Sequence, residues 1–187
     1  MRSWIRLVNI CLLSLVAAPS AFGFIDVQIF GGQRTEMVEA NRANGLDKST
    51  EKTVALHIAP IPIVPVAFGG YFSQQRYDLN GDNDLNIKAI EGWTSGAEVM
   101  TWIPFDSLIP YVKLSRYIDS SYEVTQGDQT NDAGTVLGGA KIDRGLELGG
   151  GLKWTPYSIV SLLLEARDGL SEENDSRAYL LGLEAAI

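Results

Sequence analysis

Residues 57–72 read HIAPIPIVPVAFGGYF, an apolar run that contains Pro60, Pro62 and Pro65. A membrane-spanning helix needs about 20 apolar residues and is kinked or broken by interior prolines. A central β-strand loses a ladder hydrogen bond at every proline. We therefore expect two strands to meet here, with the prolines in the turn between them, where a fixed φ helps and few backbone donors are needed.

Two later stretches have the same organisation. Residues 101–117 read TWIPFDSLIPYVKLSRY and residues 152–167 read LKWTPYSIVSLLLEAR, and each holds two alternating apolar runs separated by a proline. Pro60, Pro104 and Pro156 then mark three turns at nearly regular intervals. Such a repeat predicts an array of hairpins, with tight apolar turns on one side and long polar connections on the other.

Eight stretches of about 9–11 residues alternate apolar and polar side chains with a period of two. They begin near residues 25, 54, 66, 96, 111, 145, 160 and 178. This is the length that a tilted strand needs to cross a bilayer. A soluble β-sandwich also alternates and is the alternative, but its apolar faces would pack together instead of facing lipid.

The connections and the aromatic residues favour a membrane barrel. Short turns are expected at 60–65, 104–109 and 155–158, and longer polar connections near 36–52, 76–92, 119–141 and 168–176. Aromatic residues form one group near the short turns (Trp102, Phe105, Trp154, Tyr157) and another toward the opposite strand ends (Phe72, Tyr77, Tyr117, Tyr179). Unequal connections and two aromatic girdles are typical of outer-membrane barrels.

These features resemble the small eight-stranded outer-membrane barrels of the OmpA-like transmembrane type. The resemblance covers residues 24–187 and rests on architecture, not on a diagnostic peptide. It implies an all-β fold, a closed antiparallel up-and-down barrel in the outer membrane of a Gram-negative bacterium. It also implies a monomer, contact with outer-membrane lipid and lipopolysaccharide, and the barrel-assembly machinery as a partner. Such barrels usually end in an aromatic residue, whereas this chain ends in Ile187.

Residues 1–23 are expected to be a signal peptide that is removed before the barrel domain folds. Arg2 and Arg6 precede an apolar stretch, and the small residues Ala21 and Gly23 fit a peptidase site. The alternative is an N-terminal anchor helix, for which the apolar stretch is short.

Removal of this segment would also change the composition of the chain. It contains Cys11, the only cysteine, so the mature protein would fold without disulfides. Loss of Arg2 and Arg6 would change the formal charge from −8 to about −10. This acidic balance argues against nucleic acid as a partner, because no basic surface is available for the phosphates.

The polar faces of the expected strands carry both acidic and basic side chains. An eight-stranded barrel is only just wide enough to be filled by its own side chains. We expect an inward ion-pair network of Asp26, Arg34, Glu98, Lys113, Glu147, Lys153, Glu165, Arg167 and Glu184. Buried charges persist when they are paired, so the network predicts a plug. The alternative is a narrow pore or a carrier of a small ligand.

Antiparallel pairing around the turns makes this expectation specific. Lys113 should lie within reach of Glu98 across the turn near Pro104. Around the turn near Pro156, Glu147 should face Glu165, and Arg167 should lie between them.

Three glycines, Gly145, Gly149 and Gly151, are expected on one inward face. They leave room for large inward side chains, which include Tyr111, Met100 and Arg167. A ligand cavity is the other interpretation, although glycine also eases strand curvature.

The apolar faces make predictions for the opposite side of the wall. Lipid-facing positions should include Leu114, Leu148, Leu183 and, near the middle of its strand, Leu162. Arg116 shares this face but should lie at the outer rim, where it can reach lipid phosphates.

Some small outer-membrane barrels modify lipids, and such an enzyme would need catalytic residues. A hydrolase needs a nucleophile within hydrogen-bond reach of a base, and His57 is the only imidazole. It is expected inside the barrel near a short turn, where a lone histidine is usually structural. We therefore expect no enzyme, catalytic residue or cofactor, with a lipid-modifying enzyme as the alternative.

Residues 78–86 read DLNGDNDLN and resemble a calcium loop in their alternating oxygen donors. Asn83 and Ala89 occupy the positions where an EF-hand needs glycine and glutamate, so no metal site is expected. The sequence thus favours a structural or surface-interaction role, carried by acidic external loops on a rigid barrel.

Overall fold

The computed structural model describes nine strands. Their bounds are β1 Ile25–Glu36, β2 Lys48–Ile58, β3 Val66–Asp78, β4 Ile87–Trp102, β5 Leu108–Gln126, β6 Gln129–Asp132, β7 Leu146–Tyr157, β8 Val160–Gly169 and β9 Ser176–Ala186. The described residues are 25–37, 47–61, 64–79, 87–126, 129–132, 145–157, 159–170 and 175–186. The expected signal peptide and Ile187 lie outside them. No helix in these ranges is long and apolar enough to cross a membrane.

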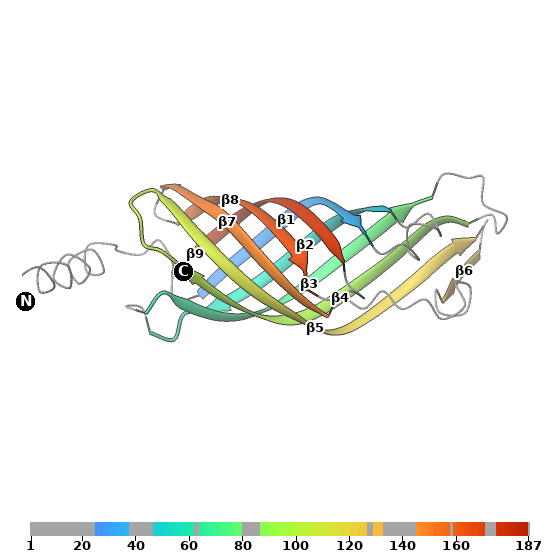
Figure 1. The fold of residues 1–187 in the computed structure, drawn as a ribbon, viewed down its shortest axis with the longest axis horizontal. Coiled ribbons are helices and arrows are strands. Elements are labelled where there is room, and N and C mark those ends of the chain that lie inside the picture. Colours follow the sequence, from blue (N-terminus) through green and yellow to red (C-terminus); the bar gives the residue numbers. More distant parts are fainter. Residues whose placement is uncertain are drawn as a thin grey trace, which may run out of the picture.

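Eight of the strands close into a barrel with tilted strands (Figure 1). Every neighbouring pair is antiparallel, in the order β1, β2, β3, β4, β5, β7, β8, β9, and β9 pairs back with β1. Closure leaves the barrel without a free sheet edge. The predicted closed eight-stranded antiparallel barrel is confirmed. The short β6 pairs with the end of β5 and stands beyond the barrel wall.

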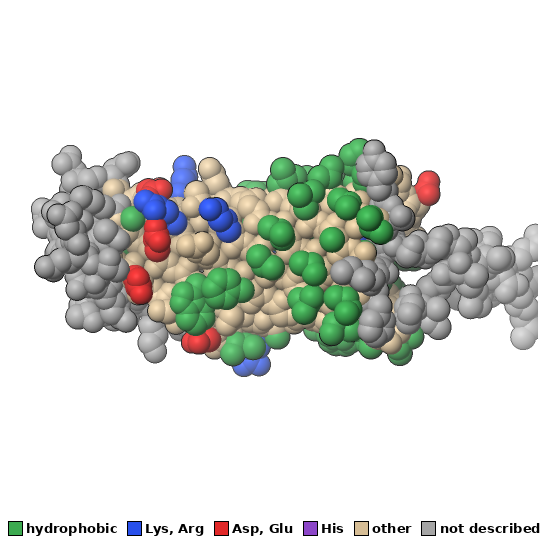
Figure 2. Space-filling model, turned by 180° about the vertical axis from the view of Figure 1, so that it is seen from behind, with side chains coloured by type: hydrophobic (Ala, Val, Ile, Leu, Met, Phe, Trp, Pro, Cys, Tyr) green, Lys and Arg blue, Asp and Glu red, His purple; other side chains and the backbone are tan. Residues whose placement is uncertain are grey.

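Alternation along each strand turns apolar side chains outward and leaves inside the barrel the polar side chains together with a smaller apolar cluster that includes Phe30 and Leu163. In β2, Thr53 and His57 are buried, whereas Val54 and Leu56 are exposed. Figure 2 shows hydrophobic side chains spread over the wall, with most of the exposed charged side chains gathered toward one end. A sandwich buries its apolar faces against each other, so this inverted pattern rules out the β-sandwich and fits a wall that faces lipid.

The four leucines expected to face lipid lie on the outer wall. Their exposed fractions are 41% for Leu114, 44% for Leu148, 39% for Leu162 and 54% for Leu183. The prediction that Leu162 lies near the middle of its strand is wrong, because Leu162 is the third residue of β8 and lies opposite Trp154. Leu164, opposite Leu152, is closer to the middle of the strand.

The three short connections lie close to their predicted places, with one difference that changes the register. Pro60, Pro65 and Pro104 lie between strands, whereas Pro156 lies inside the end of β7. The pairing of β7 with β8 is irregular between Trp154 and Tyr157, and a proline is tolerated where the ladder is interrupted.

This irregularity moves the centre of the β7–β8 turn toward the C-terminus. Glu147 pairs with Gly169, and Glu165 pairs with Gly151. The prediction that Glu147 faces Glu165 across the turn is therefore wrong.

Two strands extend well beyond the predicted length. β4 has 16 residues and β5 has 19, so they occupy parts of the segments 76–92 and 119–141 that were expected to be connections. The extensions turn apolar side chains such as Ile90 and Val124 inward, the reverse of the membrane-spanning part, and hydrophobic alternation with an outward apolar face therefore did not reveal them. A β-bulge also interrupts the alternation in β5. Gly96 pairs with Tyr117 but Ser95 pairs with Asp119, which leaves one extra residue in β5.

Candidate functional site

The nine charged residues expected in the lumen all lie inside the barrel. Each is at most 3% exposed: Asp26, Arg34, Glu98, Lys113, Glu147, Lys153, Glu165, Arg167 and Glu184. They come from β1, β4, β5, β7, β8 and β9, and the period of two turns each of them inward. The lumen is thus the place where most of the buried charge of the described chain is concentrated.

Arg34 of β1 joins two carboxylates from different strands. Its Nε donates to Oε2 of Glu51 on β2 at 2.8 Å, and its Nη1 donates to Oε1 of Glu147 on β7 at 2.7 Å. Nη1 also donates to the Ser176 hydroxyl of β9 at 2.8 Å. One guanidinium therefore connects strands on both sides of β1 with one across the lumen, a geometry that its forked donors allow.

Arg167 of β8 has different partners from those predicted. It pairs with Glu165 on its own strand, and its Nη1 lies 3.5 Å from Oε1 of Glu51. Glu147 is held by Arg34 instead. Arg167 was expected between Glu147 and Glu165, but the shifted turn places Gly149, and not Glu147, opposite Arg167.

Lys113 of β5 lies among several acceptors. Its Nζ donates to Oε1 of Gln28 at 3.1 Å, and lies 3.1 Å from Oε2 of Glu165 and 3.7 Å from Oε1 of Glu98. The ammonium also lies 4.8 Å from the centre of the Phe30 ring, where the aromatic face attracts a cation.

These contacts form one continuous network. Glu51 links Arg34 to Arg167, and Glu165 links Arg167 to Lys113. Beyond Lys113, Gln28 donates to Glu184 at 2.8 Å, and Glu184 pairs with Lys153. The Ser73 hydroxyl of β3 donates to Glu51 at 3.2 Å, so every barrel strand contributes a polar side chain. Such cross-links resist any separation of the walls because each buried charge needs its partner.

His57 is fully buried and close to a carboxylate. Its Nε2 lies 2.6 Å from Oε1 of Glu98, and the Ser115 hydroxyl donates to Oε2 of Glu98 at 3.1 Å. In a catalytic triad the imidazole lies between the acid and the nucleophile. Here the carboxylate lies between the imidazole and the hydroxyl, so His57 is not placed to take a proton from Ser115.

Two buried acids belong to the lumen but were missed. Glu36 accepts from the Tyr77 hydroxyl at 2.8 Å, and Glu51 binds both buried arginines. Both lie at the edge of a segment that was assigned to an external connection. Every second residue of a strand faces the same side, and His57 was expected to face inward. Counting back along β2 in steps of two from His57 would therefore have placed Glu51 inside as well.

The complete set makes the lumen acidic. Seven carboxylates are buried there, those of Asp26, Glu36, Glu51, Glu98, Glu147, Glu165 and Glu184. Among the residues that the structure describes, four buried permanent cations face them, Arg34, Lys113, Lys153 and Arg167. The previously expected set was nearly balanced, so the additional acids change the electrostatic character of the interior.

Glycines in β7 make room for the large residues of the network. A Cβ on Gly151 would lie 2.3 Å from the Leu164 carbonyl oxygen and 2.7 Å from the Tyr111 ring, and one on Gly149 would lie 3.4 Å from Cγ of Arg167. Tyr111 uses this space to donate to Oε2 of Glu165 at 2.7 Å.

Replacement of Gly151 with alanine should lower the free energy of unfolding by about 1–3 kcal/mol, because the new methyl group meets backbone and ring atoms. Gly150→Ala is the matched control, since its Cβ would face outward and meet nothing closer than 3.8 Å. Urea unfolding of both variants in vesicles checks the difference, and equal stabilities would contradict the packing described for Tyr111.

No metal site is evident among the described residues, where no group of three or more histidine, cysteine or acidic side chains could hold an ion. Most of the calcium-like segment 78–86 lies outside those residues. Its first residue, Asp78, binds Nε of Arg76 at 2.7 Å on the exposed rim.

Comparisons with known proteins give matches at the level of structure. No protein-family model matches the sequence, and a search of curated proteins finds no relative. The crystal structure of Neisserial surface protein A superposes with a TM-score of 0.55 and 11% identity, covering 87% of this chain and 96% of that one. A de novo designed transmembrane β-barrel gives 0.48 and 13% identity, covering 89% and 97%. The attachment invasion locus protein Ail of Yersinia pestis gives 0.47 and 13%, covering 86% and 95%. The likeness to Neisserial surface protein A shows that the fold is that of the small outer-membrane barrels.

Proposed function

We propose that this chain is an integral protein of the Gram-negative outer membrane, with a plugged lumen and a structural or surface-interaction role. The observation that carries the proposal is the continuous network of ion pairs and hydrogen bonds in the lumen, to which every barrel strand contributes a polar side chain. An eight-stranded barrel has no width to spare once such side chains fill it. The proposal includes export with removal of residues 1–23, insertion by the barrel-assembly machinery, and a monomeric state.

The surface role is assigned to the end that carries the long connections. Charged side chains gather there, such as Arg177, which pairs with Asp168 at 2.6 Å on the exposed rim. The connecting segments add further acids, including Glu172 and Glu173. Polar loops on a rigid scaffold are where binding residues concentrate in such folds.

The purified protein should run at two positions on a gel, depending on whether it is boiled, and should not conduct ions in a planar bilayer. A closed barrel stays compact in detergent until heated, and a filled lumen offers no water path. Failure to refold into vesicles would contradict the membrane assignment. Steady conductance by a refolded, heat-modifiable sample would contradict the plug alone.

The acidic lumen supports a second candidate, a narrow path for small cations. Seven buried carboxylates against four permanent cations would favour positive ions if the network opened. The same bilayer recording tests it, because a path of this kind should pass sodium in preference to chloride.

The lipid-modifying alternative is tested separately by mass spectrometry of lipid A from cells with and without the protein. We expect identical spectra.

A further inference from the structure

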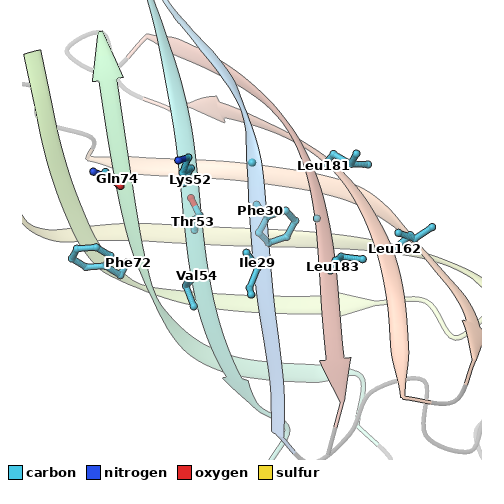
Figure 3. A pocket seen from close by; sticks show the side chains of 12 residues that line it. Ile29, Phe30, Lys52, Thr53, Val54, Phe72, Gln74, Leu162, Leu181 and Leu183 are labelled. Atoms are coloured by element: carbon cyan, nitrogen blue, oxygen red, sulfur yellow. The ribbon is translucent and has the colours of Figure 1, made fainter. Parts of the chain in front are cut away.

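The outer wall carries a hollow of about 770 Å³ over β1, between β9 and β3 (Figure 3). Gly31 is one of the residues that line it, and a Cβ there would meet no heavy atom within 4 Å. The surrounding apolar side chains are Ile29, Val54, Phe72, Leu181 and Leu183. The missing side chain of one outward residue therefore produces a depression in an otherwise continuous apolar wall.

Strand pairing places a polar edge on one side of this hollow. Gly31 pairs with Lys52 and Leu181, and Lys52 pairs with Gln74. Ile29 lies two residues closer to the short turns than Gly31 does. Its partners on the adjacent strands, Val54 and Leu183, are also apolar. In Figure 3, Lys52 and Gln74 lie on the same side of the hollow, away from Ile29 and Val54. The hollow thus lies where the apolar wall gives way to polar residues toward the long connections.

The cations near the hollow differ in their pairing. Arg76 is paired with Asp78 and Glu91 on the exposed rim. Lys52, and Lys48 further along the same face of β2, are both exposed and form no ion pair with a described acid. Two positive side chains without a described acidic partner, next to an apolar hollow, complement an anionic group.

We infer that the hollow binds one acyl chain of a phosphorylated glycolipid of the outer leaflet, with the Lys52 ammonium at its phosphate. Apolar side chains bury the methylene groups, and a compact ammonium is a good partner for a phosphate at the polar boundary. Lys48 extends the positive surface away from the apolar wall. This inference rests on the proposed outer-membrane location and adds a specific lipid site to it.

Native mass spectrometry of the folded barrel tests the inference, with diphosphoryl lipid A and phosphatidylethanolamine titrated in separate detergent samples. Gly31→Phe and Gly31→Leu fill the hollow without an expected clash, because the space is open. Lys52→Gln removes the charge. Gly150→Phe and Arg116→Gln are matched controls, because both positions face outward on the opposite wall and Arg116 is an exposed cation that does not line this hollow.

The wild-type barrel should retain one lipid A in preference to phosphatidylethanolamine. Both Gly31 variants should reduce retention of lipid A several-fold, and Lys52→Gln should reduce it about fivefold, the effect of one interfacial cation on an anionic lipid. The two controls should bind as the wild type does, and inorganic phosphate alone should leave the mass of the barrel unchanged.

Three results would overturn the site. The first is that the Gly31 variants bind lipid A as the wild type does. The second is that Lys52→Gln keeps the full preference for lipid A. The third is that the control variants lose as much binding as the test variants. Heat-modifiable migration of every sample shows first that the barrel is folded. If the wild type does not fold into a barrel, the proposed membrane role fails; if it folds and the variants bind equally, only the lipid site fails.

Discussion

Replacement of Arg167 with alanine should lower the free energy of unfolding by about 3–5 kcal/mol, because it removes one partner of a buried charge cluster. The guanidinium is 1% exposed, pairs with Glu165 and Glu51, and lies 5.5 Å from the centre of the Phe30 ring. Glu165 would retain Lys113, and Glu51 would retain Arg34. Lys113 already pairs with Glu98, and Arg34 already pairs with Glu147. The buried cluster would therefore be left with one more uncompensated negative charge.

Urea unfolding in vesicles measures this loss, and two further variants identify its cause. Arg167→Met removes the charge but keeps much of the side-chain volume. The loss of stability that Arg167→Met and Arg167→Ala have in common is therefore caused by the lost charge. Arg177→Ala removes an arginine from an exposed pair with Asp168 and should cost at most about 1 kcal/mol. If Arg167→Ala were as stable as Arg177→Ala, the network would not hold the barrel together.

The Arg167→Ala barrel should also pass a small, cation-selective current. Loss of the guanidinium leaves space beside Glu51 and Glu165, which line the lumen and attract positive ions. Planar-bilayer recording at two salt concentrations checks this, with Arg167→Met expected to leak less because it fills the space. A variant as silent as the wild type would show that the remaining side chains suffice to close the lumen.

The sequence predicted the direction in which side chains point better than the depth at which they lie. Alternation alone turned Arg34, Lys113 and Glu184 inward, because every second residue of a strand faces the same side. Depth depends on register, and register depends on the turn. The proline at 156 was interpreted as the turn itself, and the structure shows that it lies before the turn, in an irregular end of β7.

Ion-pair partners could not be predicted for a related reason. Arg34 and Glu147 are 113 residues apart and belong to strands that are not neighbours in the barrel. Their contact depends on two long side chains that meet across the lumen, and the period of two contains no information on such contacts. Glu51 was missed because its strand begins in a polar segment, where hydrophobic alternation gives no signal.

Leu164→Arg should lower the free energy of unfolding by about 2–4 kcal/mol if the outer wall faces hydrocarbon. Leu164 is 59% exposed, the fifth residue of the ten in β8, and lies between Leu152 and Leu181. An arginine there would have apolar neighbours on both adjacent strands and would have to reach toward the headgroups to keep its hydration.

Leu162→Arg supplies the depth control on the same face of the same strand. Leu162 lies opposite Trp154 near the short turn, and the cost of an arginine falls to about 0–1 kcal/mol close to the membrane interface. Refolding into vesicles followed by urea unfolding measures both variants. A soluble barrel would tolerate the two arginines equally, because both leucines are already exposed. A clear loss at Leu164 with a small one at Leu162 therefore distinguishes a lipid-facing wall from a water-facing one, and equal losses would contradict the depth assigned to β8.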